Sequence, residues 1–174
     1  MSEMFKALIV GDEQFKRTLE GIVRFAKRPR LTMKDMAAAL EEQTEDNFAA
    51  EGRPKWTTLS DTTIRARLGG GKAYRKDGSM RKSAERTKQT MKILQDSGRL
   101  AASVHSQHGD DYAMTGAARP YARIQQLGGQ AGRGLNVTLP SRPYLPFSSD
   151  GTLQKEAEQE LLKIGEEHLR RSAK

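Results

Sequence analysis

Cysteine is absent from the 174 residues of this chain. Its absence excludes disulfides, iron–sulfur clusters, thiolate zinc sites and a cysteine nucleophile, and it fits work in a reducing cytoplasm. Long hydrophobic runs are absent too. None approaches the roughly 18 residues of a membrane-spanning helix, and the first ten residues lack the pattern of a signal peptide. We therefore expect no membrane association and no export.

Catalytic motifs are also missing. The glycine-rich stretches at 68–72 and 128–134 lack the spacing and ending of a phosphate-binding loop, and no serine stands in a nucleophile elbow. We expect no enzyme activity, no metal and no cofactor. The catalytic alternative is a metal-dependent hydrolase that uses the clustered residues His105, His108, Asp110 and Asp111.

Aromatic residues are scarce, at 6% of the chain, and the single tryptophan is Trp56. Large aromatic side chains contribute strongly to the cores of small domains. We therefore expect Trp56 to be a core anchor that packs against the N-terminal helices. A chain of this length can bury such a core in one domain, and we expect residues 1–174 to form a single domain.

The net charge of +8 lies in one segment. Between Arg65 and Lys92, ten basic residues stand against two acidic ones, which accounts for the whole excess. Three consecutive glycines and few large apolar side chains predict a flexible, exposed loop at about 65–92. It is either a solvated loop or an arm that meets an anionic surface of nucleic acid or protein. The candidate contacts are Lys72, Arg75, Lys76, Arg81, Lys82, Arg86 and Lys88.

Charges of opposite sign are also segregated elsewhere. A basic cluster at 24–34 precedes an acidic cluster at 41–51, and the C-terminal segment carries five glutamates between positions 156 and 167. Unlike patches on one chain suit head-to-tail self-association, which can close into a ring. The alternative is that these charges are ordinary solvated faces of helices.

Helical periodicity marks both ends of the chain. Apolar residues recur every three or four positions at 11–27, at 32–52 and at 150–171. Such spacing places them on one face of a helix. A short basic turn with Pro29 separates the first two stretches, which predicts an antiparallel helical hairpin. The third stretch predicts a long C-terminal helix.

Weaker signals in the middle of the chain predict short elements. Capping residues, paired glycines, prolines and alternating patterns supply these signals. They predict short helices at 61–67, 97–103 and 120–127, a β-hairpin at 104–117, a flexible loop at 129–134 and an extended run at 135–149. The fold class is therefore α+β, with an N-terminal helical hairpin, a small antiparallel sheet in the middle and a long C-terminal helix.

Four segments, taken together, are similar to a known family. They are PKWTTLSDTTIRAR at 54–67, ILQDSGRLAASV at 93–104, YARIQQLGG at 121–129 and SRPYLPFSSD at 141–150. Their order and spacing resemble the phage virion morphogenesis, or tail-completion, family of Mu-like and P2-like contractile-tailed phages, over about residues 10–170. Gln125 stands where that family often has histidine, which argues against histidine chemistry there.

The resemblance implies a structural role and no catalysis. Such proteins complete the head-proximal end of the tail so that it can join a DNA-filled head. Related folds form rings, often sixfold, around the tail channel, as tail terminators do. The implied partners are further copies of this chain, the tail tube or tail terminator, and neck or head-closure proteins, with non-specific contact to phage DNA. The implied location is the virion tail or neck, after assembly in the bacterial cytoplasm.

Two finer hypotheses and one alternative function follow. We expect the 65–92 segment to be disordered in the free subunit and to order on a neighbour or face the channel. We expect Arg142, Pro143 and Tyr144 to fix an extended segment at a subunit edge, unless Arg142 forms a local ion pair instead. The alternative function is a nucleic-acid-binding module, although Tyr74 is the only aromatic residue in the basic segment and makes a poor stacking platform.

Overall fold

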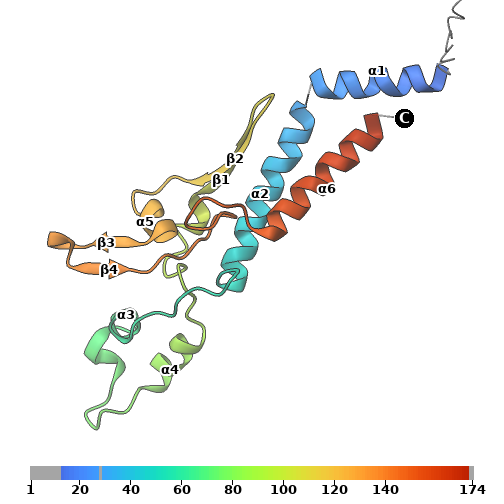
Figure 1. Ribbon diagram of the computed structural model, residues 1–174. Coiled ribbons are helices and arrows are strands. Elements are labelled where there is room, and N and C mark those ends of the chain that lie inside the picture. Colours follow the sequence, from blue (N-terminus) through green and yellow to red (C-terminus); the bar gives the residue numbers. More distant parts are fainter. Residues whose placement is uncertain (1–12, 28, 173–174) are drawn as a thin grey trace, which may run out of the picture.

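Helices from both ends of the chain dominate the computed structural model, which describes residues 13–27 and 29–172 (Figure 1). The N-terminal pair is α1 (Glu13–Lys27) and α2 (Arg30–Ala50), and the last element is α6 (Lys155–Ser172). Two small antiparallel sheets lie between them in the sequence. This arrangement confirms the predicted α+β class. The described residues include no helix that is long and apolar enough to cross a membrane.

The longest helical contact joins α2 to α6, which are distant in the sequence (Figure 1). Near one end, Nε2 of His168 lies 2.7 Å from the carboxylate of Asp35, and near the other end Asn47 donates to Gln154 at 2.9 Å. The sequence predicts that α1 and α2 form the hairpin, whereas α1 turns away from α2 and packs on α6. Periodicity shows which face of a helix is apolar but not which distant helix covers it.

Two β-hairpins extend the middle of the chain. In the first, β1 (Val104–His108) pairs with β2 (Ala113–Ala117), which confirms the hairpin predicted at 104–117. Both strands lie against α2. In the second, β3 (Gly129–Ala131) pairs with β4 (Val137–Leu139). The sequence predicts a flexible loop where β3 lies. Its three residues carry no strand pattern of their own, and only the pairing with β4 makes them a strand.

Glycines with positive φ limit two of the short helices in the middle of the chain. α5 (Ala122–Leu127) ends at Gly128, where φ is +72° and an added Cβ would lie 2.6 Å from the backbone nitrogen of Ser141. The helix predicted at 97–103 is present only as a 3-10 turn over Ala101–Ser103. Gly98 has φ of +67°, which a right-handed helix does not allow.

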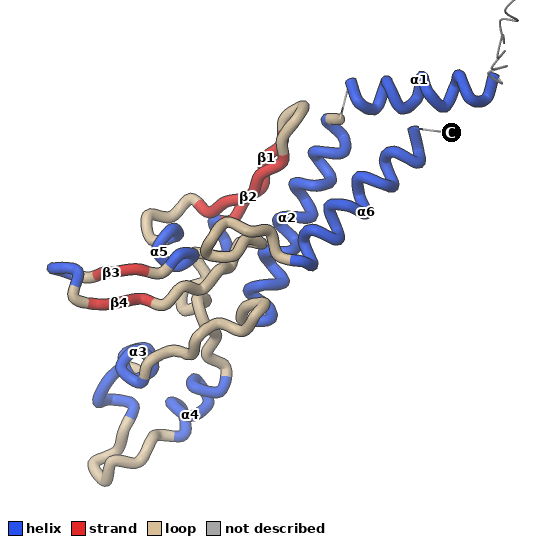
Figure 2. The backbone as a smooth tube through the Cα atoms, viewed as in Figure 1, coloured by secondary structure: helices blue, strands red, loops and turns tan. Residues whose placement is uncertain are grey.

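The basic segment forms an arm with helices of its own, defined here as the basic arm, residues 61–92. It contains α3 (Asp61–Arg67), a 3-10 turn over Gly70–Ala73 and α4 (Lys82–Gln89). It extends from the body at the end opposite α1 (Figures 1 and 2). The prediction of a loop missed α4, where Lys, Arg, Glu, Gln and Ala favour a helix despite the dense charge.

The core lies where the body meets the hairpins and the arm. Phe48, Trp56, Leu100, Ala122 and Tyr144 form one buried cluster. The rings of Phe48 and Trp56 meet edge to face at 5.9 Å, and Phe48 also stacks on Tyr144 at 5.4 Å. The structure thus places Trp56 in the core against α2.

A sharp turn after α2 brings Trp56 back into this cluster. Gly52 has φ of +97°, and its nitrogen donates to the carbonyl of Asn47 at 2.8 Å. An added Cβ at this position would lie 2.4 Å from the ring of Trp56. The turn therefore requires glycine both for its backbone angle and for the space beside the indole.

Candidate functional site

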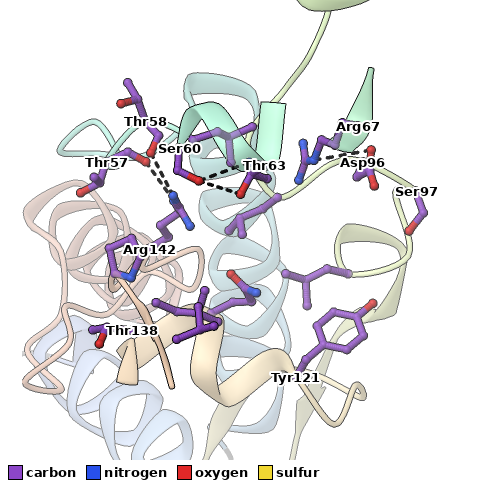
Figure 3. Close-up of a pocket in the computed structure, with 17 residues that line it drawn as sticks. Thr57, Thr58, Ser60, Thr63, Arg67, Asp96, Ser97, Tyr121, Thr138 and Arg142 are labelled. Atoms are coloured by element: carbon purple, nitrogen blue, oxygen red, sulfur yellow. Dashed lines mark hydrogen bonds and ion pairs between the residues drawn. The ribbon is translucent and has the colours of Figure 1, made fainter. Parts of the chain in front are cut away.

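The four segments that carry the family resemblance meet around one pocket beside the core. The pocket has a volume of about 550 Å³ and is lined by residues of 54–67, 93–104, 121–129 and 141–150, together with β4 (Figure 3). Leu100 belongs both to the core cluster and to the pocket wall. The positions with the most distinctive sequence pattern are therefore joined in space.

Arg142 fixes one side of this pocket. Its Nε donates to the carbonyl of Thr57 at 2.9 Å, and its Nη2 donates to that of Thr58 at 3.1 Å (Figure 3). The side chain is 6% exposed. Burial lowers the pKa of Arg142, and the nearby positive charge of Arg67 lowers it further. Arg142 makes no ion pair with any described carboxylate, so backbone carbonyls take the place of the ion pair considered from the sequence.

Pro143 and Tyr144 continue the same extended segment inside the subunit. The carbonyl of Pro143 accepts a hydrogen bond from the indole Nε1 of Trp56 at 2.9 Å. Tyr144 is 1% exposed, and burial raises the pKa of its hydroxyl to about 12. The contacts found for Arg142, Pro143 and Tyr144 lie within one subunit. Their predicted role at an edge between subunits stays a prediction.

Side-chain amides hold this segment in place. Oε1 of Gln126 accepts from the backbone nitrogens of Tyr144 and Leu145 at 2.9 and 3.0 Å, and its Nε2 donates to the carbonyl of Phe147 at 2.7 Å. Asn47 donates to the carbonyl of Tyr144 at 3.1 Å. The family resemblance concerns Gln125, whereas these contacts fall on Gln126, which no motif in the sequence indicated. The only available signal was the helical position of Gln126, which faces the same side as Ala122.

The seven candidate cations of the basic arm are all exposed. No ion pair joins any of them to a described acidic residue. Arg75 reaches only the hydroxyl of Ser79 at 3.4 Å, and Arg81 only the carbonyl of Tyr74 at 3.4 Å. The structure brings these cations together on one extension of the molecule, with their charge uncompensated.

One acidic residue of the arm, Asp77, forms its hydrogen bonds within the turn that contains it. Asp77 accepts from the hydroxyl of Ser79 at 2.7 Å and from its backbone nitrogen at 2.9 Å, and these bonds lower the pKa of Asp77. The carboxylate therefore shapes the turn between the 3-10 helix and α4. It does not pair with the neighbouring cations.

The base of the arm is attached to the body. Arg67 lies 3.6 Å from Asp96, and its Nη1 donates to the carbonyl of Lys92 at 2.9 Å. The carboxylate of Glu51 accepts from the backbone nitrogen of Ile93 at 2.6 Å. These contacts attach both ends of the arm to the body and leave the tip of the arm exposed.

The acidic clusters are partly neutralised locally. On α6, Glu166 pairs with Arg170 at 3.4 Å and Glu167 with Arg171 at 3.5 Å. Other acids are used inside the fold, as when Glu41 accepts from Ser106. The exposed acids that make no ion pair with a described cation include Glu42, Glu45, Glu156 and Glu158.

The histidines and aspartates of the catalytic alternative do not assemble. His105 is exposed on β1, and Asp110 pairs with Arg30 at 3.3 Å. No group of three or more potential metal ligands occurs within the described ranges. Nothing in the described geometry therefore favours a metal-dependent hydrolase.

Comparisons with known proteins agree with the resemblance. The phage virion morphogenesis family matches residues 10–170. Mu-like prophage FluMu G protein 2 of Haemophilus influenzae is 28% identical, over 82% of this chain and 83% of that protein. Putative capsid assembly protein G of Escherichia phage Mu is 33% identical, over 71% and 72%. Mu-like prophage FluMu G protein 1 of H. influenzae is 30% identical, over 70% of each chain. No solved structure matches the chain significantly.

The family match covers the pocket, the core and the basic arm together. It assigns a structural role in building the virion, in agreement with a site made of packing contacts, backbone hydrogen bonds and surface charge. The chain belongs to the phage virion morphogenesis family and is a structural assembly protein rather than an enzyme.

Proposed function

We propose that the protein completes the head-proximal end of a phage tail and so allows the tail to join a filled head. The observation that carries this proposal is the basic arm, whose seven exposed cations are left unpaired by the described acids of the chain. Uncompensated charge on a projecting element suits contact with an anionic surface outside the subunit. The family match supports an assembly role for such a contact.

The proposed form is a ring, sixfold as in the related folds, around the DNA channel. Its neighbours are further copies of the chain, the tail tube or tail terminator, and neck or head-closure proteins. Support comes from surfaces of unlike charge on one subunit, because the arm is basic whereas Glu156 and Glu158 are exposed in the first turn of α6. A head-to-tail contact between unlike surfaces can close into a ring.

The test is negative-stain microscopy of lysates from the phage with an early stop codon in this gene. The proposal expects filled heads beside separate tails of normal length. Intact virions would contradict it. Missing or malformed heads would favour a role in the head instead, as the name of the phage Mu relative, putative capsid assembly protein G, indicates for that protein.

A nucleic-acid-binding module remains the second candidate because the unpaired cations of the arm suit phosphates as well as carboxylates. Its test is the binding of the purified chain to duplex DNA at increasing salt. Tight, sequence-specific binding at physiological salt would favour it. Weak binding that disappears as salt rises fits contact with DNA in a channel, since only phosphate contacts would contribute.

A further inference from the structure

Arg142 presents unused hydrogen-bond donors to the pocket. Its Nε and Nη2 are bonded to backbone carbonyls, whereas Nη1 has no hydrogen-bond partner among the described residues. Every fully enclosed side-chain nitrogen and oxygen in the described chain is hydrogen-bonded. Nη1 is therefore not fully enclosed, although the residue is only 6% exposed, and Arg142 is one of the residues that line the pocket. A guanidinium that is held by two carbonyls and keeps one accessible donor is positioned to bind an acceptor that enters the pocket.

The lining of the pocket also carries one more positive charge than negative charge. Its charged lining residues are Arg67, Asp96 and Arg142. Asp96 lies 3.6 Å from Nε of Arg67, so this acid is already committed to one of the two cations. In the close-up, Arg142 and the Arg67–Asp96 pair lie on different sides of the pocket (Figure 3). A monoanion between them would complete the charge balance.

The rest of the lining favours a carboxylate on a hydrocarbon stem. Hydroxyl groups from several serines and threonines supply further donors, and apolar side chains form the remaining wall, including Leu94, Leu100, Val137 and Leu139. Apolar walls suit the methylene groups of an acidic side chain. A backbone phosphate of nucleic acid is held between sugars and enters such a recess less readily. The volume of about 550 Å³ accommodates a side chain with the adjoining main chain.

We propose that this pocket binds the carboxylate of an aspartate or glutamate from a protein partner, with Arg142 as its main contact and Arg67 as the second. The inference rests on the proposed function only in taking the partner to be a virion protein. The exposed acids named above make a second copy of this chain one source, and another tail or neck protein is the other. The pocket contact is separate from the exposed charges of the basic arm.

The test is a nuclear magnetic resonance titration of the full chain, followed at the side-chain Nε–Hε signals of its arginines. The probes are N-acetylglutamate N-methylamide, the corresponding glutamine compound and inorganic phosphate. We expect a saturable shift of the Arg142 signal with the glutamate probe, with a dissociation constant of about 1–10 mM, and no saturable shift with the glutamine probe. R67Q should weaken binding about fivefold or more because it removes a charge-assisted contact.

R123Q is the matched control. Arg123 is exposed on α5 and does not line the pocket, so the variant should bind the glutamate probe like the unmodified chain. R142Q should abolish the shift of the other pocket signals, while R67Q keeps the test valid if R142Q fails to fold. Equal shifts with glutamate and glutamine, or no saturable shift with glutamate, would overturn the proposal. Tighter binding of phosphate would also overturn it and assign the pocket to phosphate groups.

Sedimentation of the chain and of R67Q identifies the source of the carboxylate once the probe binds. Weaker self-association of R67Q supports the pocket and assigns the acid to a second copy. Unchanged association supports the pocket and assigns the acid to another virion protein. The titration uses the isolated chain, so its outcome is independent of the lysate microscopy that tests tail completion.

Discussion

At the scale of single residues, amides and arginines organise this fold more than ion pairs do. Gln126 and Asn47 bind the backbone of the segment that follows Pro140, and Arg142 binds the backbone before α3. Each of these side chains forms hydrogen bonds with backbone groups that lie outside the sheets and have no neighbouring strand to pair with. Buried backbone groups need such partners, so changes at these residues should be costly.

Q126L should destabilise the protein by about 2–5 kcal/mol, because it leaves buried backbone groups of Tyr144, Leu145 and Phe147 without partners. The measurement is urea unfolding followed by the fluorescence of Trp56. The matched control is Q125L, which makes the same chemical change at the adjacent residue, whose side chain makes no hydrogen bond to any residue that the structure describes. The control should cost less than about 1 kcal/mol. Equal losses would contradict the bridging role of Gln126.

Tyr144 should make the protein less stable as the pH rises from about 10 to about 12. Burial raises the pKa of Tyr144 to about 12 in the folded state, whereas an unfolded tyrosine titrates near 10. In this window the unfolded chain loses the proton and the folded chain keeps it, so unfolding becomes more favourable. Y144F should reduce this alkaline loss, as measured by unfolding free energies at several pH values. An unchanged pH dependence in Y144F would contradict the assignment.

At the scale of elements, local signals identify the helices, and the contacts between distant segments do not follow from them. Periodicity indicates α2 and α6 because their apolar positions repeat, and Ser60 indicates α3 because its hydroxyl accepts from Thr63 at 3.3 Å. Sequence reasoning misses β3, whose strand character depends on β4. It also misses the pocket, because the free donor of Arg142 arises only when four distant segments meet. The four segments that carry the family resemblance are the ones that line the pocket, but the sequence does not show that they contact one another.

Trypsin should cut the free chain first between residues 69 and 92. This part of the basic arm is rich in lysine and arginine, and Ala73 and Ala84 are its only fully buried residues. Segments with few buried contacts open most readily. Mass spectrometry of the first fragments is the measurement, and the same sites should be protected in assembled tails. First cuts within α2 or α6 would contradict this expectation.

At the scale of the whole molecule, the basic arm and α1 lie at opposite ends of an elongated body (Figure 1). An arm that projects from one end and concentrates exposed cations there can make directional contacts, which an evenly charged surface does not favour. Folding and assembly can therefore be separated by experiment, because the exposed cations of the arm contribute little to the core.

The variant K72Q/K76Q/K88Q should fold normally and fail to support tail completion. The side chains of these three lysines are exposed and make no hydrogen bond or ion pair with described residues, so their loss should change stability by less than about 0.5 kcal/mol each. Complementation of the early-stop phage is the measurement. The control K34Q/R123Q/K155Q removes the same charge outside the arm and should complement fully. Full complementation by the arm variant would exclude these charges from assembly.

The pairing of α2 with α6 also has a consequence for synthesis. α2 is complete after residue 50, but its helical partner begins only at residue 155. The core cluster lies before residue 155, but α2 cannot gain its helical cover until the final segment has left the ribosome, since contacts between distant segments form late. A stop codon anywhere before residue 155 should leave α2 uncovered and yield no competent subunit. Late nonsense alleles should then behave like complete deletions, with no partial subunit competing for assembly.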